Sequence, residues 1–162
     1  MASLILKMSV SLDGHVASRD GNTDWLAAGR SDDSTGWVLE TVSNAAAHLI
    51  GAATYAAWAG YWPGASGPFA KAMNEIPKVV FSNSLTSTDW GETEIAAGDL
   101  AAAITRLKQE RSSDRYLLAQ GGHGSPDRLS RPAWSTSTAL SSTRSSWAPA
   151  SGSSPHRSPS NR

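Results

Sequence analysis

A pair of adjacent glycines, Gly121-Gly122, directly follows the apolar segment 116–120. Because glycine has no side chain, such a pair lets backbone N–H groups approach a pyrophosphate closely, and a helix beginning there would add the positive end of its dipole. A glycine pair after a strand is more often only a turn, by roughly two to one. The pair therefore predicts a turn. It predicts a phosphate site only if other hydrogen-bond donors lie close to the same turn.

Two further segments carry groups that bind phosphate or ribose. Ser82-Asn83-Ser84 follows the apolar segment 78–81 and offers hydroxyl and amide donors, although a polar turn explains it at least as well. Gly51 to Tyr55 follows the apolar segment 48–50, and its Thr54 hydroxyl could meet a phosphate or simply cap a helix. Both segments keep these two interpretations open.

A fourth segment, Asp13-Gly14, follows the first apolar segment, 4–10. Asp13 could serve a substrate, but Asp-Gly is foremost a tight-turn signal. The chain has no cysteine, which excludes a disulfide framework and a cysteine nucleophile. No metal site is predicted, because metal-ligand spacing is lacking among the four histidines, which are His15, His48, His123 and His156.

All four segments follow short apolar runs that are typical of strands, and helical patterns lie between these runs. Strands are predicted at 4–10, 48–51, 78–81 and 116–120, and helices at 37–46, 54–58, 69–76 and 100–108. Ser31 to Ser34 supplies the start signal of the first helix and Asp99 caps the last one. Strands that alternate with helices predict an α/β fold with many parallel strand pairs, whose ligands bind beyond the carboxyl ends of the strands.

Composition divides the 162 residues into two unlike parts. Residues 125–162 contain 13 serines, five prolines, five arginines and a single acid, a net charge of +4 against −4 for residues 1–124. We expect no helix or strand in 125–162, because this composition buries too little apolar surface to offset the entropy of ordering. A basic linker is the alternative interpretation of this tail.

Charge and hydropathy exclude several classes of protein. The formal net charge of zero argues against a basic nucleic-acid footprint over the whole chain. No apolar run approaches the ~20 residues of a membrane span, and the apolar start has no cleavage-site pattern. We therefore expect a cytoplasmic chain with one folded domain, 1–124, that binds a small molecule and neither nucleic acid nor membrane.

Several short motifs, taken together in chain order, are more specific than a general α/β pattern. They are Ser11-Leu12-Asp13-Gly14, Asp24-Trp25-Leu26, Leu49 to Tyr55 followed by Tyr61-Trp62-Pro63, Lys78 to Ser82, and Leu117 to Gly122. In this combination residues 3–124 resemble the dihydrofolate-reductase-like family, which includes the C-terminal reductase domain of the bifunctional riboflavin-pathway deaminase–reductase. No single motif carries the resemblance alone.

The resemblance implies a three-layer αβα fold, bound NADPH, and hydride transfer to a pteridine-like or ribosylaminopyrimidine substrate such as 5-amino-6-(5-phosphoribosylamino)uracil. It also implies a homodimer, as in many relatives. By motif, Gly51, Gly121 and Gly122 would hold the cofactor, with the glycine pair at its pyrophosphate. Thr54 would meet a cofactor phosphate, and Ser82 and Asn83 the adenosine ribose and its 2′-phosphate. The catalytic positions near the nicotinamide and the substrate would be Asp13 and Gly14.

The chain departs from the family at one position of this set. Ala52 stands where relatives commonly have arginine after the glycine of the second strand. Without that guanidinium a bidentate phosphate partner is missing, so the affinity for NADPH, or its preference over NADH, is expected to be lower. The deaminase half of the bifunctional enzyme is absent, since it requires histidine and cysteine zinc ligands.

The tail also departs from the family. Relatives continue after the glycine pair with a helix, a strand resembling Gly-Leu-Val-Asp-Glu, and His-Pro-Val-Val-Leu-Gly, none of which is present. In the neighbouring reading frame, Trp134-Ser135 can encode valine, Trp147-Ala148 encodes glycine, and the adjoining codons are compatible with both motifs at their proper spacing. We therefore hypothesise a one-base frameshift near codon 124.

Without the family's last strands, the sheet is expected to be incomplete at its C-terminal end, with an unpaired edge on strand 4–10. This expectation supports a second interpretation, in which the chain is an inactive truncated or frameshifted relative and at most a nucleotide-binding module. A nucleic-acid-binding protein that uses the basic tail is the weakest of the three interpretations.

Overall fold

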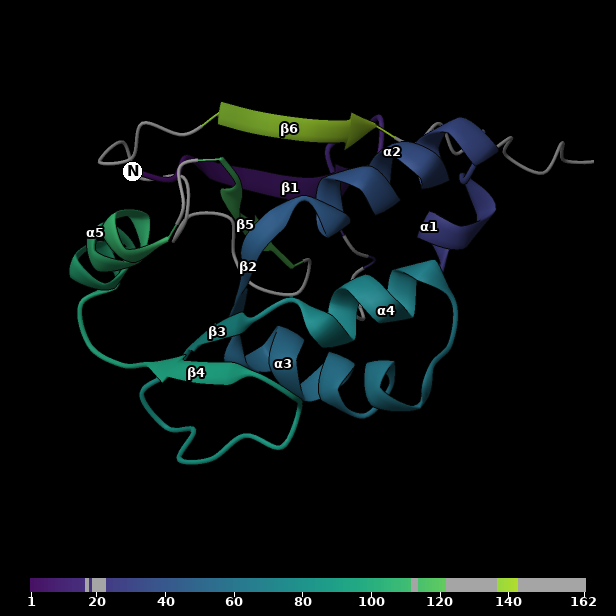
Figure 1. The fold of residues 1–162 in the computed structure, drawn as a ribbon. Coiled ribbons are helices and arrows are strands. Elements are labelled where there is room, and N and C mark those ends of the chain that lie inside the picture. Colours follow the sequence, from purple (N-terminus) through teal and green to yellow (C-terminus); the bar gives the residue numbers. More distant parts are fainter. Residues whose placement is uncertain (17, 19–22, 112–113, 122–136, 143–162) are drawn as a thin grey trace, which may run out of the picture.

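The computed structural model describes residues 1–16, 18, 23–111, 114–121 and, for the backbone alone, 137–142. Six strands form one sheet in the order β4-β3-β2-β5-β1-β6, and every neighbouring pair is parallel (Figure 1). In chain order the strands are β1 (Leu4–Val10), β2 (Ala45–Gly51), β3 (Lys78–Phe81), β4 (Thr93–Ala96), β5 (Tyr116–Gln120) and β6 (Ser137–Ser142).

Helices cover both faces of this sheet, so the α/β prediction is confirmed. The helices are α1 (Trp25–Ala28), α2 (Asp32–Ser43), α3 (Ala52–Ala59), α4 (Pro68–Glu75) and α5 (Leu100–Glu110), with a 3-10 turn at Trp62–Gly64. One core cluster packs α5 against the sheet and the other packs α2, α3 and α4 against the opposite face. Adjacent strand residues divide between the two clusters, as Leu117 and Leu118 do, because side chains alternate along a strand.

Local sequence signals define most element boundaries. Strands β1, β3 and β5 have the predicted bounds, and the Asp99 side chain caps α5 by accepting a hydrogen bond from the N–H of Ala101 at 2.9 Å. Helix α2 begins at Asp32, because Ser31 and Ser34 form a capping box. It ends at Ser43, earlier than predicted, since Arg115 donates to the backbone carbonyls of Ser43 and Asn44 and the buried alanines that follow join β2.

The sequence analysis missed two strands, β4 and β6. The expectation of no strand within 125–162 is wrong for residues 137–142, which pair with β1 from Ile5↔Ser137 to Val10↔Ser142. The expectation of an unpaired β1 edge is therefore wrong as well. A parallel ladder is made by backbone groups, so a serine-rich segment can complete it. Residues 125–136 and 143–162 lie outside the described residues, and their predicted disorder remains a prediction.

Candidate functional site

The parallel sheet brings the predicted segments to one edge. Because all paired strands run the same way, their carboxyl ends meet at the same edge (Figure 1). The strand order β3-β2-β5-β1 places Ser82-Asn83-Ser84 first, then Gly51 to Tyr55, then Gly121, and finally the turn after β1. Gly122 lies outside the described residues.

The closest approach in this set joins Thr54 to Gly121. A Cβ atom at Gly121 would lie 3.0 Å from Thr54 Oγ1, so only glycine fits without displacing the threonine. The reason is space, since the φ angle of Gly121 is not in the left-handed region. Gly51 differs, because a Cβ there would meet nothing within 4 Å. We call Gly51, Thr54 and Gly121 the Thr54 corner.

The polar groups of the Thr54 corner are available to a ligand. Thr54 is 6% exposed, and its hydroxyl has no hydrogen-bond partner among the described residues. It is the third residue of α3, so the alternative that it caps this helix is wrong. The N-cap is Gly51, and no side chain caps the first turn. A helix N-terminus with a buried hydroxyl and a facing glycine backbone has the chemistry of an anion site.

A buried polar pair directly precedes Gly121 in the sheet. The amide of Gln120 donates to His48 Nδ1 at 3.0 Å and contacts the sulfur of Met73 at 3.8 Å. Burial lowers the pKa of His48 to about 4, helped by the positive charge of Lys78. At neutral pH the imidazole is therefore uncharged, and its Nδ1 accepts a hydrogen bond from the Gln120 amide, which positions the residue that immediately precedes Gly121.

Ser82 and Asn83 are partly occupied by their own turn. Ser82 Oγ accepts hydrogen bonds from the N–H groups of Ser84 and Leu85 at 3.2 and 2.9 Å. Asn83 Oδ1 accepts from the N–H of Gly98 at 2.9 Å, which ties this turn to the start of α5. The structure thus bears out the turn interpretation. The Ser82 hydroxyl also lies 3.5 Å from the Ser84 hydroxyl, so the amide N–H groups of Asn83 are the donors that the turn leaves for a ligand.

The loop after this turn is anchored to two helices. The Tyr55 hydroxyl of α3 donates to Asp89 Oδ1 at 2.9 Å and accepts from the N–H of Asp89 at 3.1 Å. Trp90 Nε1 donates to Asn74 Oδ1 of α4 at 2.7 Å. These contacts hold Ser82-Asn83-Ser84 in a fixed place relative to the Thr54 corner.

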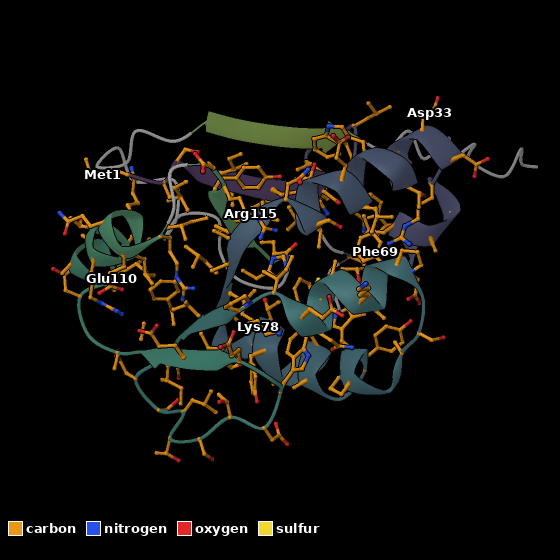
Figure 2. All side chains as sticks on the ribbon, viewed as in Figure 1. Met1, Asp33, Phe69, Lys78, Glu110 and Arg115 are labelled. Carbon is orange, nitrogen blue, oxygen red and sulfur yellow. The ribbon has the colours of Figure 1, made fainter. Side chains whose placement is uncertain are left out.

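A buried lysine supports the same region. Lys78 lies inside the molecule (Figure 2), where its ammonium donates to the backbone carbonyls of Asn74 and Ile76 at 3.0 and 2.9 Å. Its Nζ lies 4.7 Å from the ring centroid of Trp90, and burial lowers its pKa. Lys78 binds backbone carbonyls at the C-terminal end of α4 and is the first residue of β3. Its role is therefore structural, because it fixes α4 relative to the sheet.

The turn after β1, residues 11–15, which we call the Asp13 turn, differs from the Thr54 corner. The Ser11 hydroxyl donates to Asp13, and His15 Nδ1 lies 3.3 Å from Asp13 Oδ2. The hydrogen bond from Ser11 lowers the pKa of Asp13, and the backbone and His15 add to the effect. Gly14 has a φ of +86°, which a tight turn requires. The side chain of Asp13 is an exposed carboxylate.

The sequence analysis left one charged residue at this edge unassigned. Lys7 stands in β1 opposite Gln120 in the register. Its signal in the sequence is a lysine inside an otherwise apolar strand, which an amphipathic edge strand would explain equally well. Only the sheet register shows that it lies next to the Thr54 corner.

No cluster of histidine, aspartate and glutamate side chains in the described ranges could hold a metal ion. None of the described helices is long and apolar enough to cross a membrane.

One family model matches most of the chain. The profile of the family described as the RibD C-terminal domain matches residues 2–122. A solved structure from Shewanella sp. PV-4, assigned by its description to riboflavin biosynthesis, is 23% identical with a TM-score of 0.56. That match covers 74% of this chain and 65% of the other, so the chain spans just under two thirds of that relative. At this identity the likeness shows the fold.

A second solved structure is the Thermotoga maritima diaminohydroxyphosphoribosylaminopyrimidine deaminase/5-amino-6-(5-phosphoribosylamino)uracil reductase. It is 22% identical, with a TM-score of 0.49, and the match covers 74% of this chain and 39% of that one. No curated protein sequence matches the chain.

Proposed function

The chain belongs to the RibD C-terminal domain family, and on this premise we propose that it is a reductase of riboflavin biosynthesis that uses NADPH. The proposed substrate is a ribosylaminopyrimidine such as 5-amino-6-(5-phosphoribosylamino)uracil, or a pteridine-like relative. NADPH, when bound, supplies the hydride. The protein then needs to bind and orient the two reactants, which suits a site without a catalytic dyad among its described residues.

The observation that carries this proposal is the contact between Thr54 and Gly121. Strands β2 and β5, which are far apart in the sequence, lead into Thr54 of α3 and into Gly121. A largely buried threonine therefore faces a glycine backbone at the carboxyl edge of a parallel sheet. The residues fit a cofactor phosphate, because a side chain at Gly121 would fill the space between them. Thr54, Gly51 and the first turn of α3 would hold the pyrophosphate together with Gly121 and Gly122.

The remaining predicted residues take roles consistent with their surroundings. Ser82 and Asn83 would meet the adenosine ribose and its 2′-phosphate with the donors that their turn leaves unused. The lowered pKa of Asp13 keeps its carboxylate charged at neutral pH. Asp13, next to Gly14, would therefore orient the nicotinamide or the substrate by accepting hydrogen bonds, and would not donate a proton.

Ala52 makes a specific difference to this proposal. It is the first residue of α3, where a guanidinium would reach a phosphate at the helix N-terminus. Because this guanidinium is missing, the expected preference for NADPH over NADH is lower. A titration with both cofactors, on the chain and on its Ala52→Arg variant, measures this preference directly.

The test of the function is NADPH binding followed by substrate reduction. We expect saturable binding of NADPH to the full chain, followed by oxidation of NADPH when 5-amino-6-(5-phosphoribosylamino)uracil is added. Dihydrofolate tested in parallel distinguishes the pteridine-like class. Absence of NADPH binding to a folded chain would contradict the proposal.

A second candidate function, a nucleotide-binding relative without activity, rests on the tail. β6 supplies the backbone of a strand beside β1, but the family motifs are compatible only with the codons of the neighbouring frame, as a frameshift would require. Sequencing the gene across codons 118–162 tests the frameshift. A missing or extra base, together with NADPH-dependent activity in the repaired protein, would support the frameshift hypothesis. A shifted frame that lacks these motifs would contradict the frameshift hypothesis.

A further inference from the structure

A buried hydrogen-bonded pair, His48 and Gln120, ties together the two strands that lead into the Thr54 corner. The backbone ladder between β2 and β5 ends at Leu49↔Ala119, one residue before Gln120. Beyond that point the Gln120 amide continues the contact between the two strands, because it donates to His48 Nδ1 at 3.0 Å. Gln120 is the last residue of β5, so this side-chain bond acts directly on the backbone that leads into Gly121.

Both hydrogens of the Gln120 amide have acceptors. One is donated to His48 Nδ1, and the other is directed at the sulfur of Met73 on α4, at 3.8 Å. These contacts leave the amide a single orientation, because its oxygen in the same place would face two acceptors. A glutamine that is held at the end of its side chain also restricts the backbone that carries it, and Gly121 is the next residue of that backbone.

The pair is a poor arrangement if stability is its only purpose. His48 is fully buried, and its Nε2 makes no hydrogen bond within the described residues, although the backbone of Ala72 on α4 lies near the ring. Its register partner on β3 is the cation Lys78. Ile50, two residues further along β2 on the same face, is apolar and joins the core cluster. An apolar side chain at position 48 would avoid the cost of burying an unpaired donor, so the pair has a role other than stability.

The position of Gly121 decides how well the Thr54 corner fits an anion. A Cβ at Gly121 would lie 3.0 Å from Thr54 Oγ1, so the glycine backbone and this hydroxyl face one another at close range. A phosphate oxygen between such groups needs donor–acceptor distances of about 2.7–3.2 Å, which a displaced glycine would not provide. A corner that is held in place before the ligand arrives also avoids the entropy of ordering it on binding.

We propose that His48 is a positioning residue: through Gln120 it fixes the backbone of the Thr54 corner and so sets the affinity of this corner for the cofactor phosphate. The inference rests on the proposed function, because the ligand is the cofactor of that proposal. His48 itself touches neither cofactor nor substrate. The affinity therefore depends on the acceptor at position 48, and not on the stability that this side chain contributes.

Two substitutions at position 48 separate positioning from stability. His48→Leu removes the acceptor and the unpaired donor, so thermal stability is expected to stay the same or rise. NADPH affinity is expected to fall about three- to tenfold, the value of one neutral hydrogen bond. His48→Asn keeps an acceptor, because asparagine Oδ1 stands where histidine has Nδ1, but it buries an additional amide N–H group. It is expected to lose stability and to retain the affinity of the parent chain.

Isothermal titration and thermal unfolding of two further variants complete the test. Gln120→Met removes the donor, so it should lower the affinity by the same factor and add nothing to His48→Leu in the double variant. Val42→Ala is the matched control, because Val42 is buried in the same core cluster but lies on α2, which ends where β2 begins. It should lower the melting temperature and leave the affinity unchanged. Unchanged affinity in His48→Leu and Gln120→Met, or affinities that follow the melting temperatures of all variants, would overturn the proposal.

The backbone of Gly121 provides a measurement that needs no cofactor. In the unliganded chain, the ¹⁵N order parameter of the Gly121 amide is expected near the ~0.85 of rigid backbone for the parent and for His48→Asn. It should be lower in His48→Leu and Gln120→Met, and equal values in all four chains would contradict the positioning role. If the parent chain fails to bind NADPH while Gly121 responds in this way, the reductase function is wrong and the control of Gly121 by His48 stands.

Discussion

The Thr54 corner and the Asp13 turn stand at the same edge of the same sheet, but they use their polar groups in opposite ways. Thr54 is 6% exposed and its hydroxyl has no partner among the described residues. The side chain of Asp13 is 76% exposed and is held by Ser11 and His15. The Thr54 hydroxyl can therefore hydrogen-bond to a ligand, whereas the polar groups of the Asp13 turn already pair with one another. Burial and unmet hydrogen bonding therefore separate a binding corner from a turn.

The largest expected difference between the Thr54 corner and the Asp13 turn is in the pH dependence of the free energy of unfolding. The pKa of His48 in the folded chain is about 4, against an ordinary value of 6.5. Between these pH values the unfolded chain therefore binds a proton at His48 that the folded chain does not bind. The contribution of His48 to the free energy of unfolding is therefore fully present above pH 6.5. It is lost as the pH falls to about 4, by about 3 kcal/mol in total. Urea unfolding at a series of pH values measures this slope.

His48→Gln should remove the slope between pH 6.5 and 4, whereas His15→Gln in the Asp13 turn should leave it in place. The lowered pKa of Asp13 acts in a different window, because its contribution is lost only as the pH falls below the ordinary aspartate value of 3.8. An unchanged slope in His48→Gln would show that the buried pair next to the Thr54 corner does not control it.

Gly121→Ala is expected to damage the Thr54 corner directly. Its methyl group would lie 3.0 Å from Thr54 Oγ1, and such overpacking destabilises a protein by about 1–3 kcal/mol. NADPH affinity should fall about tenfold or more, since the backbone can no longer approach a phosphate closely. Isothermal titration and thermal unfolding measure the two effects.

Gly60→Ala is the matched control for this change, because a Cβ at Gly60 meets nothing within 4 Å and its φ is −78°. It should leave NADPH affinity unchanged. A Gly121→Ala variant that binds NADPH as well as Gly60→Ala does would remove the cofactor from this corner.

Thr54→Val removes the hydroxyl and keeps the shape. Because the hydroxyl has no described partner, the stability of the unliganded chain should stay the same or rise slightly. NADPH affinity should fall about ten- to a hundredfold, because one hydrogen bond to a charged group is worth about 1.5–3 kcal/mol. Thr54→Ser should retain most of the affinity. A loss of stability without a loss of affinity would show that Thr54 serves the fold alone.

Asp13→Asn is expected to have the smallest effect on folding. The carboxylate is exposed, so its contacts with Ser11 and His15 are screened by water. Thermal unfolding should not distinguish this variant from the parent chain, and NADPH affinity should be unchanged. A lower turnover with unchanged NADPH affinity would support the proposed role of Asp13 at the substrate.

The sequence predicted the strands far better than the edges of the sheet. β1, β3 and β5 are mostly apolar runs inside the sheet, where helices cover both faces and favour apolar side chains. β4 and β6 lie at the two edges, where one side is open and backbone pairing suffices. Serine-rich residues 137–142 therefore form a strand without any apolar pattern that could have predicted it.

The candidate site could be predicted as a set of segments and not as an arrangement. Glycine after an apolar run marks Gly51 and Gly121 alike, and nothing local distinguishes them. The structure shows that, of these two glycines, Gly121 alone has a neighbour within 4 Å of an added Cβ. Lys7 was missed for the same reason, because its neighbour Gln120 is more than a hundred residues away in the chain.

The sequence by itself determined the alternation of strands and helices, the caps at Ser31 and Asp99, and the placing of polar residues after apolar runs. These follow from contacts within a few residues, which local side-chain chemistry decides. Only the tertiary structure decided that the Thr54 hydroxyl meets Gly121, that His48 is buried against Gln120, and that Lys7 stands beside both. Such contacts depend on strand order and register, which are set by the packing of the whole sheet.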